Sequence, residues 1–193
     1  MTLAIDISNN NGIVDLSYCQ DAGVGIVVVK ATEGVNFHDD FYNRNVAHAH
    51  SCGLQVGAYD FARPSECTGA QEAAAFLRQV SQGEQVDFLA LDMEDDQVAP
   101  TADLLAFCLD WFERVANTRT CPLYLYTSHG YAQAHNLLGV SELQQFRLWI
   151  ASWSLTEPTS LSGWPGVGAW QFTDEGYTPG VGRVDQSIWY DRF

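Results

Sequence analysis

Short apolar segments alternate with helix-like segments through the first two thirds of this 193-residue chain. Five of the apolar segments are rich in β-branched or aromatic residues and have the length of buried strands. They cover residues 4–7, 25–31, 54–61, 88–92 and 122–127. Strands that alternate with helices in this way predict a parallel sheet with helices packed outside it.

Two of the intervening segments have the composition and spacing of helices. Residues 68–80 are rich in Ala, Gln and Glu. Residues 103–116 show a helical period, because their large apolar side chains recur on one face. That face carries Leu104, Cys108, Trp111, Phe112 and Val115.

The pattern changes after Thr127. Strand-like segments continue at 148–152, 167–172 and 183–188, but the stretches between them are rich in Gly, Pro, Ser and Thr and lack helical periodicity. A complete eight-fold β/α barrel takes about 250 residues, whereas this chain offers eight candidate strands in 193. We therefore predict a single α/β domain over residues 1–193, a TIM-like (β/α)5(β)3 barrel whose three closing strands lack full helices.

Four acidic residues fall where such a barrel places its active site, at the C-terminal ends of the strands. Asp6 ends the first strand, and Asp92 and Glu94 end the fourth, on the same strand face because they are two residues apart. Asp185 lies in the last strand, which neighbours the first strand in a closed barrel. Paired carboxyls are what cleavage of a glycosidic bond needs, and crowding keeps one of them protonated near neutral pH.

Each of these signals is weak alone. An Asp-x-Glu pair is also common in solvated acidic loops, and Asp6 is equally explained as the cap of the turn that follows it. The aromatic residues strengthen the catalytic interpretation, because aromatic faces stack on sugar rings. We expect the following to gather at the same strand ends: Tyr59, Phe61, Tyr124, Tyr126, Trp149, Trp153, Trp170 and Phe172.

Composition excludes several partners. A net charge of −15 argues against nucleic acid, which needs a basic surface. The chain has no apolar run long enough for membrane insertion, and no signal peptide precedes the first strand, so we expect synthesis in the cytoplasm.

The five histidines lack metal-ligand spacing, so we expect neither metal nor cofactor. The five cysteines include no C-x-x-C; we expect reduced, buried thiols, with one disulfide as the alternative.

The chain also resembles the glycoside hydrolase family 25 lysozymes over nearly its whole length. The similarity lies in the order and spacing of several short motifs. These are residues 4–8 (AIDIS), 30–34 (KATEG), 57–64 (GAYDFARP), 91–94 (LDME), 125–128 (LYTS), 148–151 (LWIA), 170–172 (WQF) and 184–185 (VD).

The resemblance implies a reduced β/α barrel that cleaves the β-1,4 bond between N-acetylmuramic acid and N-acetylglucosamine in peptidoglycan. It places the catalytic acids at Asp92, Glu94, Asp6 and Asp185. Expected substrate-binding residues are Tyr59, Tyr126, Trp153, Trp170, Gln171 and Lys30. One departure is Asp60, where the family often has His, and we expect this residue to add an acid near the site.

We hypothesise that Glu94 protonates the leaving oxygen and that Asp92 either attacks or stabilises attack by the substrate's own acetamido group. Cα atoms two residues apart on a strand are roughly 6.6 Å apart. This spacing fits both the retaining and the inverting geometry; the resemblance favours the neighbouring-group route with retention.

The expected partner is the glycan strand of bacterial peptidoglycan, cut by a monomer that inserts into no membrane. A muramidase without a signal peptide suits a phage endolysin released through a holin pore. Two alternatives remain, a non-catalytic wall-binding barrel and a chitinase-like hydrolase. The second is disfavoured by the apolar residues 88–91 before Asp92, where chitinase-type barrels carry further acids.

Overall fold

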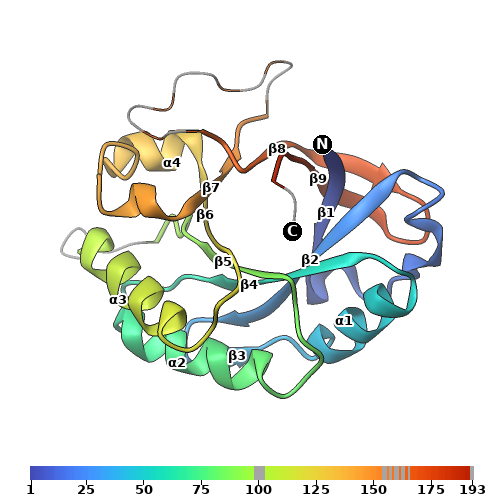
Figure 1. Cartoon of the computed structure of the whole chain (residues 1–193), viewed down its shortest axis with the longest axis horizontal. Coiled ribbons are helices and arrows are strands. Elements are labelled where there is room, and N and C mark those ends of the chain that lie inside the picture. Colours follow the sequence, from blue (N-terminus) through green and yellow to red (C-terminus); the bar gives the residue numbers. More distant parts are fainter. Residues whose placement is uncertain are drawn as a thin grey trace.

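The computed structural model of this chain describes residues 1–97, 103–153, 156, 158, 161, 164 and 166–191. Eight strands close into one barrel, seen almost end-on in Figure 1. In pairing order they are β1 (Thr2–Ile7), β2 (Val24–Glu33), β4 (Gln55–Phe61), β5 (Phe88–Asp92), β6 (Leu123–Ser128), β7 (Arg147–Ala151), β8 (Ala169–Thr178) and β9 (Gly182–Trp189). The pairing of β1 with both β2 and β9 closes the ring. A two-residue strand, β3 (Phe37–His38), adds to the end of β2.

The last strand runs against the others. Strands β1 to β8 of the barrel pair in parallel, whereas β9 is antiparallel to both β8 and β1. The cause is the tight hairpin between β8 and β9, whose turn places Gly180 and Gly182 at φ values of 79° and 92° that favour glycine. Because of this reversal, the beginning of β9 lies at the same end of the barrel as the C-terminal ends of the other seven strands.

Helices follow β2, β4, β5 and β6 along the chain, and the two helices predicted at 68–80 and 103–116 are among them. The α-helices are α1 (Tyr42–Ser51), α2 (Gly69–Val80), α3 (Leu104–Ala116) and α4 (His129–Ala134), and the 3₁₀ helices are η1 (Asn9–Asn11), η2 (Leu16–Tyr18) and η3 (Leu143–Gln145). Helix α2 begins at a capping box made by Thr68 and Gln71, and the Asp103 carboxylate caps α3.

The five β/α units and three closing strands are therefore confirmed, with one difference. In the first unit, η1 and η2 stand where an α-helix would connect β1 to β2. Helices cover the β2–β6 side of the barrel, and the described part of the β8–β9 side has none (Figure 1). Helix α4, which lacks an apolar period in the sequence, was not predicted.

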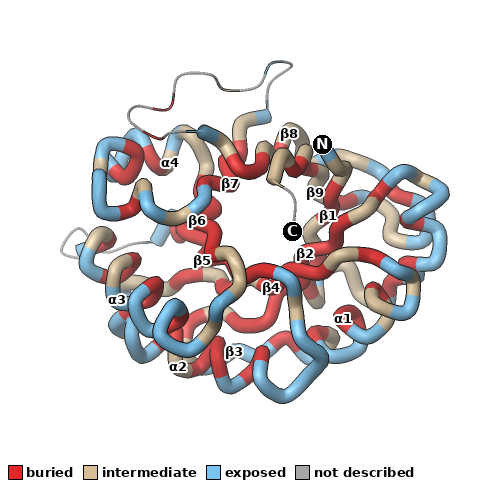
Figure 2. The backbone as a smooth tube through the Cα atoms, in the orientation of Figure 1, coloured by how far each residue is buried: buried red, intermediate tan, exposed pale blue. Residues whose placement is uncertain are grey.

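Two separate cores stabilise the fold. Inside the barrel, Phe88, Tyr124, Trp149 and Trp189 pack ring against ring with centroids about 5 Å apart. Outside it, the alternate strand residues pack against α1, α2 and α3, and the predicted apolar face of α3 is buried there. Figure 2 shows this arrangement, with buried residues on the strands and exposed residues on the outer turns of the helices.

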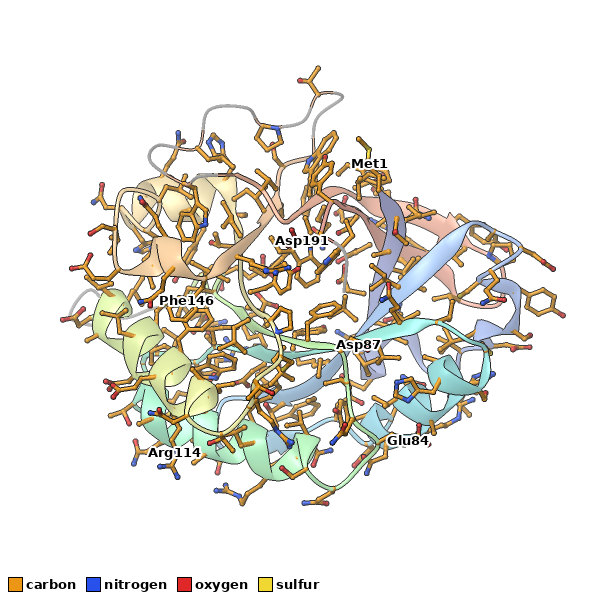
Figure 3. All side chains as sticks on the ribbon, in the orientation of Figure 1. Met1, Glu84, Asp87, Arg114, Phe146 and Asp191 are labelled. Carbon is orange, nitrogen blue, oxygen red and sulfur yellow. The ribbon has the colours of Figure 1, made fainter. Side chains whose placement is uncertain are left out.

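The N-terminal end of the barrel is closed by polar contacts around Tyr124. Its hydroxyl donates to Asp191 at 2.7 Å and accepts from Trp189 Nε1 at 3.2 Å, and Arg147 pairs with Asp191 at 3.0 Å. Figure 3 shows Asp191 inside the ring of strands. The expectation that Tyr124 joins the other aromatic residues at the catalytic end is therefore wrong, because it lies near the start of its strand.

All five cysteines are in described segments, and all are unpaired, with Cys19 and Cys108 buried. Among the described helices, none combines the length and the apolar character that crossing a bilayer requires.

The contact between α2 and α3 predicts the effect of a methyl group at Gly69. A Cβ there would lie 1.9 Å from the Phe107 carbonyl oxygen, which is backbone and cannot rotate away. Gly69→Ala should therefore force the two helices apart and lower the free energy of unfolding by about 1–3 kcal/mol, measured by urea denaturation. Gly130→Ala in α4 is the control, because nothing lies within 4 Å of its Cβ position. Equal stability of the two variants would contradict this packing.

Candidate active site

A cleft of about 380 Å³ opens at the C-terminal end of the barrel. Seven of the ten predicted site residues line it: Asp6, Lys30, Tyr59, Asp92, Glu94, Tyr126 and Asp185. They come from six different strands or the residues that follow them, so only barrel closure brings them together. The cleft lies where barrel enzymes place their catalytic groups.

Asp6 and Asp185 face each other across the β1–β9 ladder, where they are a directly opposed pair. Their carboxyls lie close enough for each to affect the pKa of the other. Burial, and then the charge of Asp185, raise the pKa of Asp6 well above its usual value. The sequence prediction that these two acids approach each other is confirmed.

Asp92 and Glu94 form the second carboxyl pair. Burial raises the pKa of Glu94 to about 7, with a further contribution from Asp185. Burial and then the Glu94 charge also raise the pKa of Asp92, which is only 6% exposed. The Oδ1 atom of Asp92 is buried and has no hydrogen-bond partner within the described part of the chain. The pair thus offers one group that holds a proton near neutral pH and one carboxyl oxygen whose bonding capacity is unused.

Gln171 is the centre of the hydrogen bonds in the cleft. Its amide nitrogen donates to Asp6 at 3.1 Å and to Asp185 at 3.4 Å, and its carbonyl oxygen accepts from Tyr126 and Trp153 at 3.0 and 3.1 Å. The side chain is 1% exposed and uses both donors and both acceptors on protein partners. These contacts hold the carboxyls in place; Gln171 does not line the cleft itself.

Lys30, Trp153 and Trp170 differ in how they lie relative to the cleft. Lys30 is 7% exposed and lies at the cleft floor, with its ammonium 2.6 Å from Glu33. Trp153 is 62% exposed and lies beside the cleft, tied to Gln171. Trp170 is not brought to the cleft, because side chains alternate along β8 and Gln171 takes the inward position. Trp170 instead packs against the outer core and donates to the Ser152 carbonyl.

Asp60 also faces away from the cleft, so the expectation that it adds an acid to the site is wrong. It follows the inward-facing Tyr59 on β4 and is buried under α2 and α3, where it accepts hydrogen bonds from Thr32 and Trp111 at 2.6 and 2.8 Å. Its carboxyl also meets that of Glu72 on α2. Burial raises the pKa of both groups, that of Glu72 to about 7, which favours a proton on this pair near neutral pH.

Several residues that line the cleft were not predicted from the sequence. Asn10 and Asn11 border the cleft from η1, and Asp174 and Arg183 border it from the β8–β9 hairpin. The first two follow Asp6 closely, so their position at a strand end could have indicated them. The hairpin residues gave no signal, because the sequence does not show that β8 continues to Thr178. No three His, Cys, Asp or Glu side chains in the described segments form a group that could hold a metal ion.

Comparisons with known proteins agree with this fold and cleft. The family model of the glycosyl hydrolases family 25 matches residues 5–181. Lysozyme M1 of Streptomyces globisporus is 28% identical over 95% of this chain, which spans 66% of that protein. The crystal structure of the bacterial lysozyme from Streptomyces coelicolor superposes with a TM-score of 0.83 at 26% identity, over 98% of this chain and 92% of that one. The CTP1L endolysin superposes with a TM-score of 0.82 at 28% identity, over 99% and 67% of the two chains.

These matches define the class of the protein: it is a glycosidase-type barrel with a carboxyl-lined cleft. The chain belongs to glycosyl hydrolases family 25.

The acid pair behind the cleft predicts a pH-dependent stability. The folded chain binds the Glu72 proton more tightly than the unfolded chain, with a pKa of about 7 against 4.5. The free energy of unfolding therefore falls as pH rises between these values. The loss amounts to about 3 kcal/mol at 1.36 kcal/mol per unit. Glu72→Gln should reduce the pH dependence of the unfolding free energy by about this amount in urea titrations at pH 4.5 and 8, while the other buried carboxyls keep their contributions. The exposed Glu113→Gln is the control; a wild-type pH dependence in Glu72→Gln would rule out a raised pKa of Glu72.

Proposed function

We propose that this protein is a muramidase that hydrolyses the β-1,4 bond between N-acetylmuramic acid and N-acetylglucosamine in bacterial peptidoglycan. The observation that carries the proposal is the state of the two carboxyls at the end of β5. Glu94 holds a proton near neutral pH, and the buried Asp92 Oδ1 lacks a donor. The family membership and the lysozyme relatives support the same substrate.

In this proposal Glu94 is the general acid that protonates the glycosidic oxygen as the bond breaks. A carboxylic acid is most effective when its pKa lies near the working pH, and burial supplies that shift here. The Lys30 charge and the nearby Tyr126 hydroxyl act in the opposite direction and limit the shift of the Glu94 pKa. Glu94 is partly exposed and lines the cleft, so the oxygen of a bound sugar can reach it.

In this proposal Asp92 contacts the acetamido group of the substrate. A buried carboxylate oxygen without a donor is costly, and an N–H group of the substrate would satisfy it. The 2-acetamido group of the sugar has such an N–H, and its carbonyl oxygen is then oriented for attack on the anomeric carbon. This supports the substrate-assisted route with retention over direct attack by Asp92.

Asp6, Asp185 and Gln171 are positioning groups in this scheme. They form one hydrogen-bonded set that borders the acids and keeps negative charge near Glu94. Tyr59 and Tyr126 line the cleft beside them, and we assign them to sugar contacts together with Trp153. The enzyme acts as a monomer and needs no metal or cofactor for these steps.

The biological setting we propose is host lysis by a phage endolysin that reaches the wall after holin-mediated release. The 28% identity to the CTP1L endolysin supports this role. The identity to Lysozyme M1 of Streptomyces globisporus supports the role of a bacterium's own lysozyme equally. Lysis of host cells by the protein added from outside, compared with lysis when it is co-expressed with a holin, distinguishes the two.

Product analysis tests the reaction itself. Purified N-acetylated peptidoglycan is digested, and borohydride-reduced products are examined by mass spectrometry. We expect reduced muramic acid ends. Reduced glucosamine ends would mean that the same acids cut the other bond, and cleavage of chitin oligomers with intact peptidoglycan would favour the chitinase-like alternative. Binding to walls without new reducing ends would overturn the enzymatic proposal.

Replacing the general acid should abolish activity without unfolding the chain. Glu94→Gln keeps the size of the side chain but cannot supply a proton, so we expect kcat to fall by about 100-fold or more. The matched control is Asp96→Asn, which removes an exposed acid two residues away that does not line the cleft. Retained activity in Glu94→Gln, with an unchanged unfolding midpoint, would refute its assignment.

The pH profile follows from the raised pKa. Because Glu94 must be protonated to act and its pKa is about 7, kcat/KM should fall about tenfold per pH unit above that value. Steady-state rates from pH 4 to 9 on soluble muropeptide oligomers measure this limb. A rate that stays constant up to pH 9 would show that Glu94 is not the titrating acid.

A further inference from the structure

A chain of ion pairs begins at Lys30, which lines the cleft, and continues through Glu33, Arg63 and Asp95, which do not. The Lys30 ammonium contacts one carboxylate oxygen of Glu33 at 2.6 Å, and the other oxygen accepts from Arg63 Nε at 3.0 Å. Arg63 Nη1 in turn donates to Asp95 Oδ1 at 2.8 Å. The alternating charges thus connect the cation at the cleft floor with the residue that follows Glu94 in the sequence.

At one end of this chain, Lys30 has little freedom. Its ammonium lies 5.4 Å from the ring centre of Phe37 and 5.0 Å from that of Phe61, both within cation–π range. Arg63 stacks on Phe61 as well, at 4.8 Å. The side chain of Lys30 is 8% exposed, so Glu33 and the two rings determine where its charge lies.

At the other end, the backbone around Glu94 is tied to the same region. Ala62 N donates to the Asp92 carbonyl at 2.9 Å, and the Asp95 carboxylate, which is 3% exposed, receives Arg63. The Arg63 backbone N–H donates to Glu72 at 3.2 Å. Glu94 is therefore held between two anchored residues, and one of the anchors depends on the Arg63 guanidinium.

We propose that Glu33 and Arg63 are positioning residues for the reaction, which together hold the Lys30 ammonium and the backbone of Glu94 at a fixed separation. The inference rests on the proposed function, since it concerns the acid assigned there. Isolated surface ion pairs contribute little, but these side chains are at most 26% exposed and share partners in one network.

The role of Glu33 is electrostatic as well as geometric. Several titratable groups face Glu94 from the elements around it. They are Asp6 on β1, Lys30 on β2, Asp92 on β5, Tyr126 on β6, Tyr131 on α4 and Asp185 on β9. Lys30 is the cation of this set and lowers the pKa of both Asp92 and Glu94. Glu33 offsets its charge and keeps the ammonium against the rings, so removing the Glu33 charge should make Glu94 lose its proton at lower pH.

The role of Arg63 is to anchor the segment after Glu94. Without its guanidinium, Asp95 loses its cation and Glu33 loses one of two partners. A displacement of about 1 Å of a catalytic group can cost about 100-fold in rate. Loss of Arg63 should therefore lower kcat while KM changes little, because the sugar-binding residues of the cleft are untouched.

The first test uses Glu33→Gln, with the distant Glu113→Gln as a charge-matched control. The alkaline limb of the pH–rate profile and the titration of the Glu94 carboxyl by ¹³C NMR are both measured. We expect both midpoints to move by about half a pH unit or more to lower pH in Glu33→Gln and to stay in place in the control. Midpoints that match wild type in the folded variant would overturn the role of Glu33.

The second test compares Arg63→Gln with Arg63→Lys. We expect kcat to fall about tenfold or more in Arg63→Gln with KM within about threefold, and partial recovery in Arg63→Lys, which keeps one cationic contact. If Arg63→Gln does not fold, Arg63→Lys alone decides, because a wild-type kcat there together with a wild-type Glu94 titration contradicts the proposal. A wild-type protein that fails to cut peptidoglycan would refute the proposed function, and the NMR titration would still decide whether this network controls Glu94.

Discussion

The pairing of β1 with β9 is the constraint on which the site depends. It closes the barrel, and the antiparallel direction of β9 sets Asp185 directly opposite Asp6. If β9 ran parallel like the other strands, the start of the strand would lie at the opposite end, where Tyr124 and Asp191 fill the barrel. Closure also removes the acids from water, and this burial is the first cause of their raised pKa values.

The cleft concentrates negative charge and compensates for only part of it. The Gln171 amide donates to Asp6 and Asp185 without neutralising them, and the Tyr126 hydroxyl donates to Gln171. The Lys30 charge is offset by its ion pair with Glu33. The result is a site in which protons remain bound at neutral pH. Such an arrangement costs stability, because each buried carboxyl opposes folding as it ionises, but in the proposed reaction it supplies the proton for glycosidic cleavage.

The barrel wall separates two acid pairs with different consequences. Alternation along β4 sends Tyr59 inward and Asp60 outward, so Asp60 joins Glu72 beneath the helices while Asp92 and Glu94 face the cleft. The outer pair, Asp60 and Glu72, affects the free energy of unfolding. It is also connected to the cleft acids, because Glu72 accepts a hydrogen bond from the backbone N–H of Arg63, whose side chain anchors Asp95.

The sequence by itself determined the strands, the helices α2 and α3, and the acids at the strand ends, because apolar periodicity and turn residues are local signals. It identified Asp6, Asp92, Glu94 and Asp185 for the same reason: each lies in or at the end of a recognisable strand. Only the tertiary structure decided which face a side chain takes and which partners it meets. Trp170 and Asp60 point outward, Gln171 is saturated by protein contacts, and Glu33 and Arg63 meet only when separate strands are brought together. These outcomes depend on register, strand direction and burial, which contacts distant in sequence establish.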